Sequence, residues 1–140
     1  MSEPVRAANA PKPVGAYPHA RRVGNLLFLS GVGPRDPATN KIIGNVFDAG
    51  GRLLNYDIEA QCRAVFANVR TILEASGARW EDLVDVTVFL TDMKRDFATY
   101  NRLYGEYFAG ARPCRTTVEV GALPTPISIE LKCIAEVRSA

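Results

Sequence analysis

Residues 57–108 constrain the fold more than any other part of the sequence. Asp57 is a residue type that caps helices, and apolar side chains follow it at spacings of three and four until Gly77, where such a helix commonly ends. Residues 83–90 are β-branched or apolar at most positions, which is typical of a strand buried on both faces. A second helix is predicted from about 92 to 108, because aromatic and apolar side chains form a stripe along it. This order implies two helices packed against a sheet.

Three further segments read as strands. Alternating or β-branched residues predict a hairpin over 21–30, a strand over 115–120 and a last strand over 127–137. The hairpin is expected to turn at Gly24-Asn25, because glycine and asparagine tolerate the backbone of a tight turn.

Two stretches have the composition of loops. Residues 31–56 are rich in glycine and polar residues, and they predict a long loop interrupted by one short strand near 42–43. Residues 1–13 contain three prolines and predict an irregular arm at the start of a single domain that spans 1–140. A loop as long as 31–56 inside a compact domain is usually functional or mobile.

Together these elements predict an α+β fold in which two helices cover one face of a mixed sheet. Nothing else in so short a chain is available to cover the other face. Thr87 and Phe89 alternate with the valines of the strand 83–90, so the open face also carries apolar surface. We therefore expect an oligomer in which the open faces of the sheets pack together.

The composition excludes several classes of function. The chain has 140 residues and a formal net charge of +2, too small to indicate a surface for nucleic acid or an anionic membrane. No apolar run approaches the roughly 18 residues of a membrane-spanning helix, and the first residues lack a signal-peptide pattern. A cytoplasmic protein is therefore expected. The three cysteines fit no metal-ligand spacing, which argues against a zinc site and against a disulfide framework.

Several motifs follow one another along nearly the whole chain. They are Gly15-Ala16-Tyr17, Leu29-Ser30-Gly31, Phe97-Ala98-Thr99-Tyr100-Asn101, Arg112-Pro113-Cys114-Arg115-Thr116-Thr117-Val118-Glu119-Val120, Leu123-Pro124 and Ile129-Glu130-Leu131-Lys132-Cys133-Ile134-Ala135. In this order they resemble the Rid family, the YjgF-type reactive intermediate deaminases. The resemblance implies a chorismate-mutase-like fold and a homotrimer whose sheets face a central barrel. It also implies active sites between subunits, no cofactor and no metal, and hydrolysis of carboxylate-bearing enamines or imines to carbonyl compounds with release of ammonia.

The resemblance also assigns candidate catalytic residues. Arg115 occupies the position of the family's substrate-binding arginine, and a guanidinium can hold a carboxylate through two parallel hydrogen bonds. Glu130 matches the glutamate that positions water and transfers protons. Tyr17 matches a tyrosine at the cleft, where a phenol can hydrogen-bond substrate or water. Asn101 also fits the pattern and is a secondary candidate for binding substrate.

Other positions distinguish this chain from many members of the family. Relatives that act on small 2-aminoacrylate-type substrates often carry cysteine where this chain has Thr117, which is a further candidate for binding substrate. His19, Arg21, Arg22 and Arg35 lie on the loops expected at the cleft. If these side chains line the cleft, it holds more positive charge than one carboxylate requires, and a dicarboxylate substrate is favoured.

The patterns Y-P-H-x-R-R and S-G-x-x-x-R resemble the 2-aminomuconate deaminase branch of the family. 2-Aminomuconate, which carries two carboxylates, is therefore the favoured substrate. General clearance of 2-aminoacrylate and related 2-imino acids is an alternative within the same chemistry. A non-enzymatic binder of small carboxylates or an RNA-binding regulator is an alternative of another class, although the chain has no basic stripe with interleaved aromatic residues.

Overall fold

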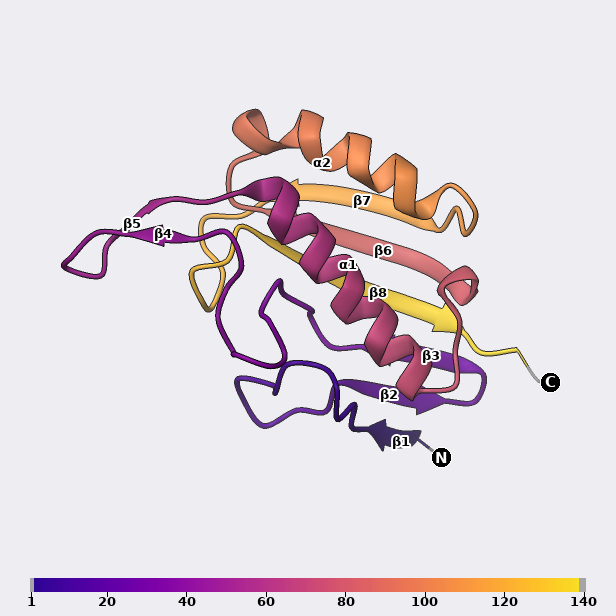
Figure 1. Ribbon diagram of the computed structural model, residues 1–140. Coiled ribbons are helices and arrows are strands. Elements are labelled where there is room, and N and C mark those ends of the chain that lie inside the picture. Colours follow the sequence, from indigo (N-terminus) through magenta and orange to yellow (C-terminus); the bar gives the residue numbers. More distant parts are fainter. Residues whose placement is uncertain (1, 139–140) are drawn as a thin grey trace.

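A six-stranded sheet forms the body of the molecule. The computed structural model describes residues 2–138, and Figure 1 shows both helices on one side of this sheet. The strand order is β1-β2-β3-β8-β6-β7, with β6 and β7 parallel and every other neighbouring pair antiparallel. The strands are β1 (Ser2–Val5), β2 (Ala20–Val23), β3 (Leu26–Leu29), β6 (Leu83–Leu90), β7 (Cys114–Glu119) and β8 (Ile129–Glu136). The predicted hairpin, central strand and two later strands are therefore all present.

The two helices begin and end close to the predicted positions. The first, α1 (Ile58–Ala75), is capped by Asp57, whose carboxylate accepts the N–H of Ala60 at 3.1 Å. The second, α2 (Met93–Phe108), is capped in the same way by Asp92. Gly77 follows α1 with a φ of +78°, a conformation that favours glycine over residues with a Cβ. A single 3₁₀ turn (Trp80–Asp82) then leads into β6.

The sheet has one covered and one open face. Alternate residues of β6 and β8 face the helices and are fully buried, among them Val86, Val88 and Leu131. The other residues of these strands point to the open face, where Phe89 is only half-buried and Val118 of β7 is 37% exposed. The prediction of an α+β fold with two helices packed on a mixed sheet is confirmed.

The structure differs from the prediction in two loop regions. Four residues of the arm expected to be irregular form the edge strand β1, which pairs only with β2; an edge strand tolerates its proline because one side of it has no partner. The long loop contains a small hairpin, β4 (Val46–Phe47) and β5 (Leu53–Asn55), instead of a strand near 42–43, where only an isolated bridge joins Ile42 to Arg35. The hairpin projects from the body in Figure 1.

The three cysteines lie in two different environments. Cys62 and Cys133 are buried, and burial raises the pKa of each thiol to about 12. Cys114 is exposed at the start of β7. Within the described residues, neither helix is both long and apolar enough to cross a membrane.

Candidate active site

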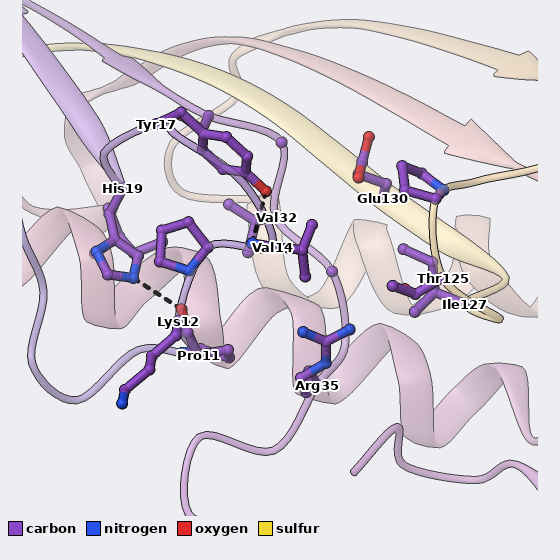
Figure 2. Close-up of a pocket in the computed structure, with 16 residues that line it drawn as sticks. Pro11, Lys12, Val14, Tyr17, His19, Val32, Arg35, Thr125, Ile127 and Glu130 are labelled. Carbon is purple, nitrogen blue, oxygen red and sulfur yellow. Dashed lines mark hydrogen bonds between the residues drawn. The ribbon is translucent and has the colours of Figure 1, made fainter. Parts of the chain in front are cut away.

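A pocket opens where the N-terminal arm, the segment after β3 and the start of β8 meet. Its walls come from three stretches, 11–19, 30–35 and 124–130, with Ile72 of α1 behind them. Figure 2 shows Glu130 and Arg35 on different sides of this space, with Tyr17 above it. The structure thus brings the candidates Tyr17, His19, Arg35 and Glu130 to one space, which we call the Glu130 pocket.

Glu130 is a half-buried carboxyl group on β8. Burial raises its pKa above the ordinary value, because the charged form loses hydration that the pocket does not replace. Gly31 lies directly against it: a Cβ at residue 31 would be 2.9 Å from the Glu130 carboxylate, closer than any ordinary contact. The glycine of the Ser-Gly motif therefore leaves room for the carboxylate.

Of the three loop arginines considered for the cleft, Arg35 lines this pocket. Its backbone carbonyl and that of Gly33 both accept hydrogen bonds from the Asn68 side-chain amide, at 2.8 and 2.9 Å. Asn68 is buried on α1, so the helix holds the loop that carries Arg35. Lys12 also lines the pocket, although Figure 2 shows its ammonium group directed away from the centre.

A second buried amide supports the opposite wall. The Gln61 side chain accepts the N–H of Ser128 at 2.9 Å and donates to the Asn45 side chain at 2.8 Å, and Asn45 donates to the carbonyl of Pro126. These bonds hold the turn before β8. The sequence prediction missed Gln61 and Asn68, although both lie on the apolar stripe of α1, where a buried amide requires hydrogen-bonding partners.

The remaining candidates form a different cluster, on α2 and β7. Arg115 donates to the side-chain carbonyl of Asn101 at 2.8 Å, and its guanidinium lies 4.7 Å from the centre of the Tyr104 ring. Thr117, two residues along β7, shares a 2.8 Å hydrogen bond with the hydroxyl of Tyr100. We call these residues the Arg115 cluster. It presents an exposed guanidinium held in place by an amide and by aromatic faces.

Within one chain the Arg115 cluster does not reach the pocket. Glu130 pairs with Phe89, which pairs with Val118, so Glu130 and Val118 lie two strand spacings apart, about 10 Å. Arg115 is three residues further along β7, another 10 Å or so, and it points to the helix-covered face with Val86. Arg35, not Arg115, is the arginine that lines the same pocket as Glu130 within one chain.

The other two predicted arginines lie outside the pocket. Arg21 donates from Nε to the hydroxyl of Ser2 at 2.7 Å, between β2 and β1. Arg22 donates to the carbonyl of Gly24 in the hairpin turn. Neither lines the Glu130 pocket. In the part of the chain that the structure describes, no three His, Cys, Asp or Glu side chains gather in a way that could hold a metal ion.

Known proteins resemble this chain along almost its whole length. The family model described as "Endoribonuclease L-PSP" matches residues 7–137. A RutC family protein of Pyrococcus horikoshii is 42% identical over 96% of this chain and 98% of its own length. The chloroplastic Reactive Intermediate Deaminase A of Arabidopsis thaliana is 38% identical over 95% of this chain and 65% of its own length.

A solved structure shows the same fold. The Escherichia coli protein TdcF, described with bound serine, has a TM-score of 0.82 and 32% identity, covering 98% of this chain and 99% of TdcF. Taken with the sequence matches, the chain belongs to the endoribonuclease L-PSP family, the Rid family of reactive intermediate deaminases.

Proposed function

We propose that this protein hydrolyses an enamine or imine acid to the 2-oxo acid with release of ammonia, without a cofactor. The observation that carries the proposal is Glu130, a carboxyl group with a raised pKa that faces a pocket also lined by Tyr17 and Arg35. A carboxyl whose pKa is closer to neutrality can both give and take a proton under working conditions. The name of the Arabidopsis relative supports deamination as the reaction class.

The reaction needs one group that donates and accepts protons in successive steps. Protonated Glu130 gives its proton to a carbon of the enamine, which becomes an iminium ion. Water then attacks the iminium carbon, and the Glu130 carboxylate takes the proton that the water loses. Glu130 next protonates the nitrogen and the C–N bond breaks. The Glu130 carboxylate then takes the hydroxyl proton as the carbonyl forms, which restores protonated Glu130. One water is consumed and one ammonia leaves, so the reaction balances without an oxidant or a reductant.

The binding of the substrate's first carboxylate is assigned to Arg115 of a second copy. Arg115 presents an exposed guanidinium that its own pocket does not use, and an arginine fork suits a carboxylate. The apolar residues on the open sheet face, such as Phe28, Phe89 and Ile134, favour packing against other copies. Both features support the homotrimer with sites between subunits that the family resemblance implies.

The favoured substrate is 2-aminomuconate, and Arg35 is the residue that favours it. With Arg115 on the carboxylate next to the amine, Arg35 supplies a second cation for the distal carboxylate. The product would be 2-oxohex-3-enedioate plus ammonia. A monocarboxylate such as 2-aminoacrylate has no second carboxylate for Arg35 to bind. The same pocket would therefore bind it less tightly than 2-aminomuconate.

The direct test is ammonia release by the purified, folded protein. Freshly generated 2-aminomuconate and 2-aminoacrylate are supplied separately, and wild type is compared with Glu130→Gln. We expect the variant to lose turnover by a factor of roughly 10² to 10⁴, the usual contribution of a general acid or base, while still binding the substrate. No ammonia from either substrate with wild type contradicts the proposal. Equal binding without turnover in both proteins would instead indicate a carboxylate-binding protein.

A second measurement tests the dicarboxylate assignment. Arg35→Met should raise KM for 2-aminomuconate by about tenfold or more, since an ion pair with hydrogen bonds is lost, and should leave 2-aminoacrylate nearly unchanged. Arg52→Met is the matched control, because Arg52 is exposed in the β4–β5 turn and outside the pocket. Equal effects of Arg35→Met on both substrates would contradict this assignment.

A further inference from the structure

The His19 ring joins two parts of the N-terminal arm. Its Nδ1 lies 3.0 Å from the backbone nitrogen of Ala7, and its Nε2 lies 2.8 Å from the carbonyl oxygen of Pro11. Figure 2 shows the bond to Pro11 at the edge of the Glu130 pocket. Both ring nitrogens are therefore occupied by backbone groups of the same arm.

These two partners determine the protonation of the ring. A backbone N–H can only donate, so Nδ1 accepts the bond from Ala7 and carries no proton. The carbonyl of Pro11 can only accept, so Nε2 carries the ring's one proton and donates it. This is the neutral tautomer with the proton on Nε2. In it, His19 has no free nitrogen with which to exchange protons with a substrate.

The backbone of His19 is itself held on both sides. Its N–H donates to the carbonyl of Val5, the last residue of β1, at 3.1 Å. Its carbonyl accepts the N–H of Ser30, the residue after β3, at 3.0 Å. The ring therefore projects from a fixed part of the sheet, and the arm is tied to that fixed part.

The arm that His19 holds is one wall of the pocket. Pro11, Lys12, Pro13 and Val14 all line the Glu130 pocket, and they lie between strands β1 and β2 with no strand or helix of their own. Tyr17 adds one more hydrogen bond within this wall, because its hydroxyl accepts the N–H of Val14 at 3.2 Å. Ala7 and Ala10, earlier in the arm, are buried in the core. Within residues 11–14, the bonds from His19 to Pro11 and from Val14 to Tyr17 are the hydrogen bonds that the structure shows.

We infer that His19 is a positioning residue, which keeps residues 11–14 in place as a wall of the substrate pocket and takes no part in proton transfer. The inference rests on the proposed function for the identity of the pocket. Its consequence is a change in substrate binding when His19 is altered, with much less change in the chemical step at Glu130. This assigns to His19 a role different from the substrate contact expected from the sequence.

Three substitutions separate the two hydrogen bonds. His19→Asn places an acceptor near the position of Nδ1 and keeps the bond from Ala7, while His19→Gln places a donor near Nε2 and keeps the bond to Pro11. His19→Phe keeps a ring of similar size and loses both bonds. Asn9→Ala is the matched control, since Asn9 is exposed on the same arm and does not line the pocket.

The measurements are kcat and KM for ammonia release, hydrogen exchange of the Ala7 amide, and the ¹⁵N shifts of the His19 ring. We expect His19→Phe to raise KM by about tenfold with kcat changed by less than about threefold. The KM values of His19→Asn and His19→Gln should lie between those of His19→Phe and wild type. The Ala7 amide should exchange slowly in wild type and in His19→Asn, and quickly in His19→Gln and His19→Phe. The ring shifts should show the Nε2-protonated neutral form.

Two results would overturn the inference. The first is an equal collapse of kcat in all three variants with the Ala7 amide still protected in His19→Asn, which would place the ring in the chemistry. The second is an unchanged KM and unchanged Ala7 exchange in His19→Phe. If wild type releases no ammonia, the proposed function fails, and the exchange data alone decide whether His19 holds the arm.

Discussion

The Glu130 pocket and the Arg115 cluster are built in opposite ways. The cluster stands on regular structure: Asn101 comes from α2, Arg115 and Thr117 come from β7, and helix and strand geometry aligns them. The pocket is made mostly of loops, which buried amides of α1 and the ring of His19 hold in place. The guanidinium of Arg115 is therefore positioned by regular helix and strand geometry, whereas the shape of the pocket depends on a few side-chain to backbone hydrogen bonds.

In the proposed function, the two regions carry complementary parts of one reaction. The pocket holds the carboxyl group of Glu130 and is lined by Arg35 and Lys12. The cluster presents an exposed arginine but has no acid or base among its named residues. They face different sides of the sheet within a chain. Under the proposed function, a complete site would combine the pocket of one copy with the cluster of another.

The largest expected effect comes from mixing two inactive variants. Glu130→Gln and Arg115→Met should each lose activity by a factor of about 10² or more when pure, because each removes one half of every site. In oligomers formed from an equal mixture, about a quarter of the sites combine an intact pocket with an intact arginine, if each pocket meets one neighbour's cluster. Ammonia release by the co-expressed mixture should recover to roughly that fraction of wild type.

The control for this experiment is the same pair of variants mixed without exchange of subunits. That sample should stay at the level of the pure variants. Activity that fails to recover in the co-expressed oligomers would show that both halves of a site belong to one chain.

Substitution of Gly31 by alanine should have the next largest effect. A Cβ at this position lies 2.9 Å from the Glu130 carboxylate, so the carboxylate has to move within the pocket. We expect kcat for ammonia release to fall by about 10- to 100-fold, since small displacements of a catalytic group are costly. Gly105→Ala is the matched control: an added Cβ meets nothing within 4 Å at this exposed position of α2, and alanine favours a helix. Equal activity of both variants would mean that the position of Glu130 is not critical.

Sequence patterns identified the helices and strands because apolar residues recur along each of them at the spacing typical of that element. The cap Asp57, the stripe of α2, the buried strand β6 and the alternation in β8 are all local signals, and each element was found within a few residues of its true limits. The Rid motifs placed Arg115 and Glu130 on the correct strands. That these two side chains lie on different faces follows from strand order and register, which no local pattern contains.

The buried amides that hold the pocket loops were not predicted, because their partners are distant in the sequence. Gln61 bonds to Ser128, and Asn68 bonds to Gly33 and Arg35, across separations of 33 to 67 residues. A polar residue on an apolar stripe signals a buried hydrogen bond but does not name its partner. The β4–β5 hairpin was missed because its strands are too short for an alternating pattern, and its turn depends on the Asp48 side chain, which accepts N–H groups from Gly50 and Arg52.

The pH profile of the reaction tests the environment of Glu130. Burial raises its pKa, so its carboxylate is protonated at a higher pH than an ordinary glutamate, whose pKa is about 4.3. The proposed reaction starts with protonated Glu130, which gives its proton to the enamine carbon. As the pH rises through the raised pKa this acid is lost, so kcat/KM should fall with a midpoint above about 4.3. A midpoint at or below 4.3 would contradict a desolvated Glu130.

The same shift predicts the sign of a stability change. In the pH range between the unfolded and folded pKa values the folded protein binds more protons, so the free energy of unfolding decreases as the pH rises. Glu130→Gln removes a carboxylate that is disfavoured by burial. Its Tm relative to wild type should therefore increase from acid to neutral pH, which thermal unfolding at several pH values measures.

The smallest expected effect is that of Arg21→Met. The sequence placed Arg21 with Arg35 at the cleft, but the structure directs it to Ser2 at the sheet edge, where its charge does not line the Glu130 pocket. KM for 2-aminomuconate should stay within about twofold of wild type, and stability should change by less than about 0.5 kcal/mol, as for other surface substitutions. A loss of dicarboxylate selectivity as large as that of Arg35→Met would mean that Arg21 reaches a site on a neighbouring copy. The boundary of the site would then extend beyond the pocket and the cluster, because the β1–β2 edge would form a third part of it.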